Sequence, residues 1–262
     1  MSVPPFVEQH VSADGFDIRY LEAGTGPVLA CLHGAGGLRI SRAHELLAER
    51  HRVIAFELPG FGASPVNDRT SSLPELAVTM RHALSALEID RCSVWGISFG
   101  GKLALWLAVQ DPGRLDGFVL AAPAAIRLES GGLPAPGDLL ALLHAHPERR
   151  LDTTPLAPDV EAKQRELVGR LIGPPRDPEL ENAMRELDVP TLVLFGAEDR
   201  LTPPELGRHY RELLPRCHFV IVYDAAHALY EDRPEAFAAI VADFLEHREQ
   251  FVVRRESGQL YP

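Results

Sequence analysis

One serine, Ser98, has the sequence context of a catalytic nucleophile. It lies at the centre of Gly96-Ile97-Ser98-Phe99-Gly100, a Gly-x-Ser-x-Gly pattern. Apolar residues precede it at 92–95 and follow it at 102–108, which predicts a strand, a sharp turn and a buried helix. On such a turn the serine backbone is strained, and the residues two positions away on each side must lack a Cβ. The hydroxyl is then exposed at a helix N-terminus, where backbone N–H groups favour negative charge.

A serine hydroxyl needs a base to remove its proton and an acid to orient that base. The sequence offers both residue types at the ends of two later apolar runs. Asp199 follows the run 191–195, and His227 follows the run 218–222. The order serine, aspartate, histidine is typical of proteins that carry the nucleophile on a strand-to-helix turn. We therefore predict Ser98, Asp199 and His227 as catalytic residues, with Glu198 as the rival orienting carboxylate.

The chain has 11 histidines, so most of them must have other roles. His33 precedes the glycine-rich segment 34–37, and we expect it to order that loop. His144 and His146 lie in a helical stretch far from the predicted catalytic residues, and we expect both to be solvated.

The elements that must position these residues alternate along the chain. Two short runs within 6–20 predict a hairpin around Asp14-Gly15, because each alternates in polarity. Apolar runs then predict buried strands, and amphipathic or apolar stretches between them predict helices. Strand and helix alternating at this spacing favour a parallel sheet with helices on both faces. The predicted strands are 27–32, 52–56, 92–95, 117–121, 191–195 and 218–222, and the predicted helices are 40–50, 72–88, 102–108, 203–214 and 234–247.

The alternation is interrupted by residues 124–188, which contain no strand candidate. A connection of this length is long for a compact domain, so we predict a helical lid inserted into a core formed by 1–123 and 189–262. Helical pieces are expected at 137–146, 159–171 and 178–187. The lid contributes no aromatic residue, and its inner face is expected to be apolar. The residues expected to form that face are Leu139, Leu140, Leu142, Leu143, Leu167, Leu171 and Ile172.

Composition excludes several classes of function. The formal net charge of −11 argues against nucleic-acid binding, which requires a basic surface. No apolar stretch approaches the ~20 residues of a membrane span, and residues 1–14 lack the features of a signal peptide. Three scattered cysteines are expected to be buried thiols in a reducing compartment. We therefore expect a cytoplasmic protein that binds a small molecule, without a membrane or nucleic-acid partner and in an undetermined oligomeric state.

Four motifs, taken in order, resemble the α/β-hydrolase superfamily over residues 11–247. The resemblance implies an eight-stranded, mostly parallel sheet with a lid between the sixth and seventh strands. It also implies an oxyanion hole made by the N–H of Phe99 and that of Ala35, or of Gly36 in place of Ala35. The motifs are His33-Gly34-Ala35-Gly36-Gly37, the segment 58–64 (Leu-Pro-Gly-Phe-Gly-Ala-Ser), the segment 96–101, and Gly196-Ala197-Glu198-Asp199 with His227.

The chain departs from the superfamily pattern at two positions and matches one branch at a third. Many relatives carry Asp at the position of Glu57, which we interpret as structural, and many carry Gly at the position of Ala226. Ser98 is a serine, whereas haloalkane dehalogenases and epoxide hydrolases need a carboxylate nucleophile. The chain therefore resembles the serine branch.

The predicted catalytic residues and the resemblance together predict a serine hydrolase that cleaves small carboxylic esters through an acyl-enzyme, with no metal or organic cofactor. The alternatives are a carbon–carbon bond hydrolase of the meta-cleavage product type, a lactonase or a perhydrolase. A further alternative is a hydrolase-like receptor that binds a small molecule with little turnover. Specificity depends on lid and pocket residues, so the sequence leaves these alternatives open.

Overall fold

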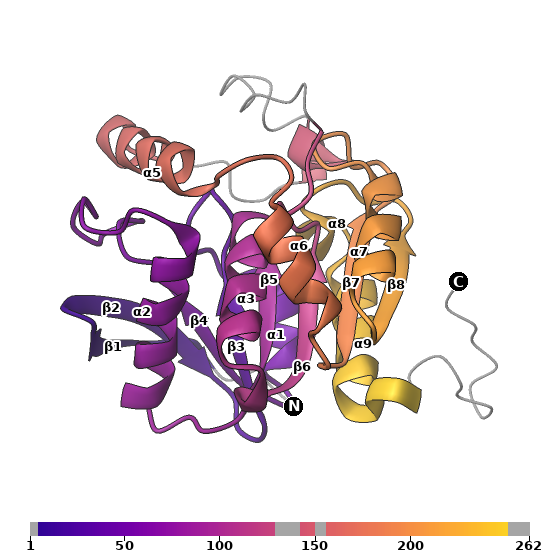
Figure 1. The fold of residues 1–262 in the computed structure, drawn as a ribbon, viewed down its shortest axis with the longest axis horizontal. Helices are drawn as coiled ribbons and strands as arrows, with labels where there is room; N and C mark the ends of the chain where they lie inside the picture. The colour runs from indigo at the N-terminus through magenta and orange to yellow at the C-terminus, as the bar shows by residue number, and fades with distance from the viewer. Residues whose placement is uncertain (1–4, 129–141, 150–155, 251–262) are drawn as a thin grey trace.

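The computed structural model describes residues 5–128, 142–149 and 156–250 of the 262-residue chain, and an eight-stranded sheet runs through its centre (Figure 1). The strand order is β1-β2-β4-β3-β5-β6-β7-β8. β1–β2 and β2–β4 pair antiparallel, and the five remaining pairs are parallel, which confirms the predicted sheet. The strands are β1 (Val7–Ala13), β2 (Phe16–Ala23), β3 (Val28–Leu32), β4 (Arg52–Phe56), β5 (Cys92–Ile97), β6 (Leu115–Ala121), β7 (Thr191–Gly196) and β8 (Cys217–Val222).

Helices cover both faces of the sheet (Figure 1). On one face α2 and α6 both contact α3, and α7 contacts α6, while α1, α8 and α9 pack together on the other. In the described part of the chain, no helix is both long and apolar enough to cross a membrane. The helices are α1 (Arg42–Leu47), α2 (Leu73–Ala86), α3 (Phe99–Gln110), α5 (Pro158–Leu171), α6 (Pro178–Arg185), α7 (Gly207–Leu213), α8 (Leu229–Asp232) and α9 (Pro234–His247).

The local sequence explains where these elements begin. All six residues of β5 are buried, as expected for a central strand with helices on both sides. The side chain of Ser72 accepts a hydrogen bond from Glu75 N, which caps α2 as the sequence predicts. The helix predicted at 40–50 is shorter, because Ser41 and His44 form a reciprocal cap that starts α1 at Arg42.

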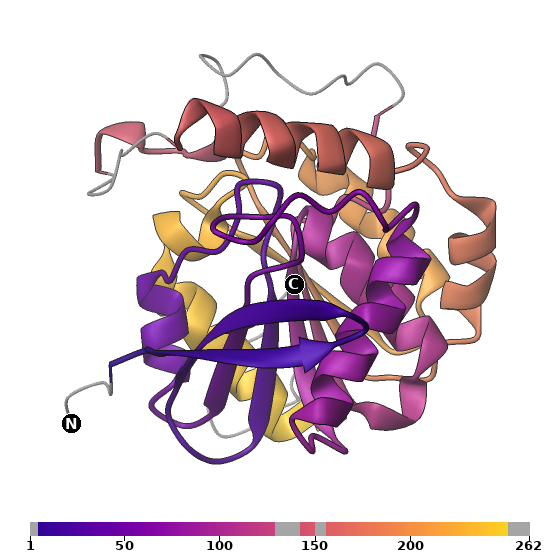
Figure 2. The ribbon, with the colours of Figure 1, turned by 90° about the vertical axis from the view of Figure 1, so that its left-hand side faces the viewer.

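The stretch between β6 and β7 contains α5 and α6 and no strand among its described residues. α5 lies across the top of the sheet (Figure 2), whereas α6 packs beside α3. The C-terminal end of α5 is bound by Lys102 of α3, whose Nζ donates to Ile172 O at 2.8 Å. Burial lowers the pKa of Lys102 to about 8. The helix predicted at 137–146 falls largely outside the described residues.

Glycine is required on both sides of Ser98, as the sequence predicts. A Cβ at Gly100 would lie 2.2 Å from Leu32 O and 2.4 Å from His33 O, so α3 starts in direct contact with the backbone after β3. A Cβ at Gly96 would lie 2.6 Å from Gly100 O. These contacts involve backbone atoms, which cannot move away as a flexible side chain could.

We predict that Gly100→Ala lowers the free energy of unfolding by about 2–3 kcal/mol, because the new methyl group overpacks the junction between β3 and α3. Urea denaturation followed by circular dichroism measures this change. Gly113→Ala is the matched control, since its Cβ would meet no atom within 4 Å. The control should change stability by no more than about 0.5 kcal/mol. Equal stability of the two variants would contradict the steric role of Gly100.

Candidate active site

A cavity of about 530 Å³ opens at the carboxyl edge of the sheet. Its lining includes residues from the segments that follow four parallel strands, namely Gly34 after β3, Ser98 after β5, Arg200 after β7 and His227 after β8. The carboxyl ends of parallel strands meet at one edge of a sheet, which explains why residues so distant in sequence share one cavity. Two of the three predicted catalytic residues, Ser98 and His227, therefore face the same space.

Ser98 stands at the N-terminus of α3 with φ 50° and ψ −111°. This positive φ is costly for a residue with a Cβ, and the surrounding hydrogen bonds hold it in place. Its N–H donates to Ala121 O at 3.0 Å, and its carbonyl accepts from Ala124 N at 2.9 Å. Ser98 is half-buried, whereas both of its neighbours are buried. The turn has the strained strand-to-helix geometry that the sequence predicts.

Asp199 and His227 are hydrogen-bonded to each other, with 2.8 Å between Asp199 Oδ2 and His227 Nδ1. Both side chains are buried. Glu198, the rival carboxylate, is exposed and thus poorly placed to orient a buried ring. Among the described residues, no hydrogen bond joins Ser98 to the His227 ring. The structure thus brings the acid and the base into contact and places the serine on the same cavity.

Thr202, which the sequence analysis missed, completes the contacts of Asp199. Its hydroxyl donates to Asp199 Oδ2 at 2.7 Å and lies 3.0 Å from His227 Nδ1. Asp199 Oδ1 accepts the N–H groups of Leu201 and Thr202 at 2.9 and 2.8 Å. These bonds fix the carboxylate and leave Nδ1 of His227 facing two oxygens, which favours a proton on Nδ1 and a free Nε2. The signal in the sequence is a hydroxyl residue three positions after the acid.

Three residues that line the cavity near Ser98 have backbone N–H groups without a partner among the described residues. Phe99 begins α3, so its N–H has no partner within that helix. Ala35 and Gly36 lie in the loop after β3, and all three residues line the cavity. No hydrogen bond between described residues uses these N–H groups. They are therefore available to bind an oxygen atom.

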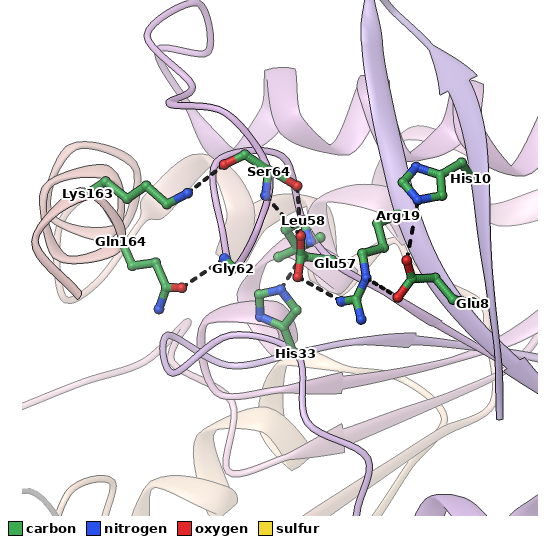
Figure 3. Close-up of polar contacts among 10 residues, drawn as sticks. All are labelled: Glu8, His10, Arg19, His33, Glu57, Leu58, Gly62, Ser64, Lys163 and Gln164. Carbon is green, nitrogen blue, oxygen red and sulfur yellow. Dashed lines mark hydrogen bonds and ion pairs between the residues drawn. The ribbon is translucent and has the colours of Figure 1, made fainter. Parts of the chain in front are cut away.

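His33 orders the loop that carries Ala35. Leu58 N donates to its Nε2 at 3.1 Å, so the proton lies on Nδ1, 2.7 Å from Gly34 O (Figure 3). Burial lowers the pKa of His33 to about 4, so the ring is neutral and suited to accept from Leu58. The side chain therefore ties the loop after β3 to the loop after β4, the role expected from the sequence.

Glu57 is a structural residue, as expected from its position before the 58–64 loop. Its carboxylate accepts from Arg19 Nη1 at 2.9 Å and from the hydroxyl of Ser64 at 2.9 Å (Figure 3). From the opposite side, α5 contacts the same loop. Gln164 Oε1 accepts from Gly62 N at 2.9 Å, and Lys163 Nζ donates to Ser64 O at 2.5 Å. The loop is thus held between the sheet and α5.

The seven residues predicted for an apolar lid face divide into three groups. Leu142, Leu143 and Ile172 line the cavity. Leu167 and Leu171 instead belong to the hydrophobic core. Leu139 and Leu140 lie outside the described residues.

The cavity wall also carries features that the sequence analysis missed. Val168 of α5 is one of its apolar residues, and arginine side chains contribute charge. The arginines that line it are Arg39, Arg127, Arg165 and Arg200.

The expectation that His144 and His146 are solvated is wrong. His144 is buried and lies 3.0 Å from Asp232, and His146 is half-buried against Asp224. Both histidines face the loop around His227. Sequence periodicity places residues on a helix but does not show which element packs against them.

The family model described as "Alpha/beta hydrolase family" matches residues 29–240, which include every residue of the site. The chain belongs to the alpha/beta hydrolase family. Its eight-stranded, mostly parallel sheet with flanking helices agrees with this assignment. Family membership, together with hydrolases among its relatives, identifies this alpha/beta hydrolase as an enzyme that catalyses hydrolysis.

Relatives of this alpha/beta hydrolase include enzymes with different reactions. It is 26% identical to a 2-hydroxy-6-oxo-6-(2'-aminophenyl)hexa-2,4-dienoic acid hydrolase of Metapseudomonas resinovorans, over 93% of this chain and 92% of that protein. It is 30% identical to a pimeloyl-[acyl-carrier protein] methyl ester esterase of Neisseria meningitidis serogroup B, over 74% of this chain and 82% of the esterase. A solved serine hydrolase involved in carbazole degradation has the same fold.

 The TM-score of the carbazole-degradation hydrolase is 0.78 at 24% identity, and 92% of this chain and 99% of that chain are covered.

We predict that Asp199→Asn lowers kcat for ester hydrolysis by about 10³- to 10⁴-fold, because an amide N–H facing Nδ1 stabilises the wrong tautomer of His227. Steady-state kinetics with p-nitrophenyl acetate measures the change. Glu198→Gln is the matched control and should stay within about threefold of wild type, since Glu198 is exposed. The reverse ranking of these two variants would assign the orienting role to Glu198.

Proposed function

We propose that this hydrolase cleaves small carboxylic esters, with Ser98, His227 and Asp199 as its catalytic triad. The observation that carries the proposal is the buried Asp199–His227 hydrogen bond on the same cavity as a strained serine. A His–Asp pair alone has many structural uses. Its position beside a serine at the start of a helix, with available N–H groups nearby, supports acyl transfer.

In the proposed mechanism, Ser98 Oγ attacks the ester carbonyl while His227 Nε2 accepts its proton. Asp199 and Thr202 hold the ring with Nδ1 protonated, so that Nε2 is the free base. The negative charge on the carbonyl oxygen is bound by the N–H of Phe99 and that of Ala35 or Gly36. Each such donor stabilises the transition state by about 3–4 kcal/mol.

The tetrahedral intermediate then collapses, and the C–O bond to the alcohol breaks. His227 gives its proton to the leaving alkoxide, which departs as the alcohol and leaves an acyl group on Ser98. Water, deprotonated by the same ring, attacks the acyl-enzyme. The bond from the acyl carbon to Ser98 Oγ then breaks, Oγ takes the proton back from His227, and the carboxylic acid leaves. The N-terminus of α3 favours negative charge in both steps.

A carbon–carbon bond hydrolase is the second candidate function. It is supported by the 26% identity to the dienoic acid hydrolase over 93% of this chain. It is also supported by the excess of arginines over glutamates in the cavity lining, four against two, because guanidinium groups bind carboxylates such as that of a dienoic acid. Turnover is measured in parallel with an ester, a lactone and a vinylogous diketone. Preference for the ester indicates an esterase, for the lactone a lactonase, and for the vinylogous diketone a carbon–carbon bond hydrolase. Tight binding of these compounds without turnover would indicate a receptor.

We also propose that residues 124–188 form a lid over the catalytic site and set the substrate range. In support, α5 lies across the carboxyl edge of the sheet, and Val168 and Ile172 contribute apolar surface to the cavity (Figure 2). None of the proposed catalytic groups belongs to this stretch. The acyl chain is therefore expected to lie against aliphatic lid side chains.

We predict that diethyl p-nitrophenyl phosphate labels Ser98 covalently, with the Oγ–P bond forming as p-nitrophenolate leaves. Ser98→Ala should abolish both labelling and ester turnover, because no other hydroxyl occupies the turn. Intact-protein mass spectrometry and peptide mapping locate the adduct. Labelling that persists in Ser98→Ala would reject Ser98 as the nucleophile.

We predict that Val168→Ala shifts the acyl-chain preference towards longer p-nitrophenyl esters, because it enlarges the cavity. Each lost methylene contact changes the free energy of discrimination between two substrates by about 1–3 kcal/mol at most. Val160→Ala is the control on the same helix, since Val160 is half-buried and does not line the cavity. Kinetics over acetate to octanoate esters measures the preference. Identical profiles for the two variants would mean that α5 does not shape the acyl pocket.

A further inference from the structure

The described lid segment 142–146 is bound to the loop that carries His227. Ala228 N donates to Leu143 O at 2.8 Å, immediately after the histidine. Ala226 N, immediately before it, donates to Asp232 Oδ2 at 2.8 Å. The residues on both sides of His227 are therefore fixed by hydrogen bonds, and one of these bonds comes directly from the lid.

Asp232 extends the second bond to the lid. Its Oδ2 also accepts from Ala145 N at 3.0 Å, and its Oδ1 lies 3.0 Å from His144 Nδ1. The side chains of Asp232 and His144 are only 3% and 4% exposed. Burial works to raise the pKa of Asp232, but its hydrogen bonds to His144, Ala145 and Ala226 outweigh burial and keep the pKa below its usual value. Asp232 is thus a buried carboxylate shared by the lid and the catalytic loop.

We propose that His144 and Asp232 are positioning residues that couple docking of the lid to the placement of His227. The proposal rests on the proposed function of His227 as the catalytic base. His144 bonds Asp232, Asp232 holds Ala226, and Ala226 is adjacent to His227. A lid displaced from this contact releases the Ala228 bond directly and removes the two lid contacts that hold Asp232, the partner of Ala226. The base is therefore correctly placed only when the lid is docked.

This coupling has a chemical consequence for the reaction. A general base must lie within hydrogen-bond reach of the hydroxyl proton, and a displacement of about 1 Å costs up to 10²-fold in rate. Removal of His144 therefore slows the chemical step at Ser98, although His144 bonds neither Ser98 nor His227 in the described structure. The lid contributes to catalysis as well as to substrate range.

A double-mutant cycle on labelling by diethyl p-nitrophenyl phosphate tests the proposal. The rate constant of labelling reports proton removal from Ser98, and the final extent counts the folded sites, so partial unfolding does not affect the rate. We expect His144→Ala to lower the rate constant about tenfold and Asp232→Ala to lower it about 100-fold, each with full final labelling. In the Asp232→Ala background, His144→Ala should change the rate less than twofold, because its route to His227 is already lost.

Two further measurements make the result specific. Val160→Ala, a lid change remote from this contact, should label at the wild-type rate. The downfield proton resonance of His227 Nδ1–H should shift in His144→Ala, which a loss of stability alone would not produce. Wild-type labelling by His144→Ala, or equal slowing in both backgrounds, would overturn the coupling. Failure of the wild-type enzyme to label would instead reject the proposed function.

Discussion

The positive φ of Ser98 is the constraint on which the rest of the site depends. A serine with a positive φ between a buried strand and a buried helix requires close packing, because α3 must start against the backbone that follows β3. Gly100 permits this approach, with Leu32 O only 2.2 Å from the position of its missing Cβ. The hydrogen bonds of Ser98 to Ala121 and Ala124 then tie the turn to β6 and to the start of the lid. Three neighbouring strands thereby share in holding one strained residue.

The buried histidines of this enzyme have different roles. His33 and His44 have pKa values lowered by burial to about 4 and about 3, so both stay neutral and act as fixed hydrogen-bond partners. His33 joins two loops, and His44 accepts from Ser41 N at the start of α1. His144 and His227 each face a buried aspartate instead. The carboxylate beside the ring, and not exposure of the ring, separates the two groups.

Polar contacts attach the described part of the proposed lid to the rest of the protein at three places. Lys102 binds the end of α5, Gln164 binds the loop after β4, and Asp232 binds the segment before α5. Many of these contacts join a side chain to a backbone N–H or carbonyl, so they depend on backbone position more than on the residue type in the partner loop. Such contacts, together with the burial of Leu167, Val168 and Leu171 in the core, place α5 over the cavity. They also place the lid in contact with the loops on either side of the proposed catalytic residues.

The sequence by itself determined the sheet, the order of its strands along the chain and the turn at Ser98, because apolar periodicity and glycine spacing are local properties of the chain. It also indicated Asp199 over Glu198, through the position after β7. Only the tertiary structure showed the Thr202 hydroxyl beside the ring of His227, and His144 against Asp232, an acid 88 residues away. These contacts join segments with no regular spacing between them, since the folded sheet brings separate loops to one edge. The solvated lid histidines expected from the sequence became buried partners for that reason.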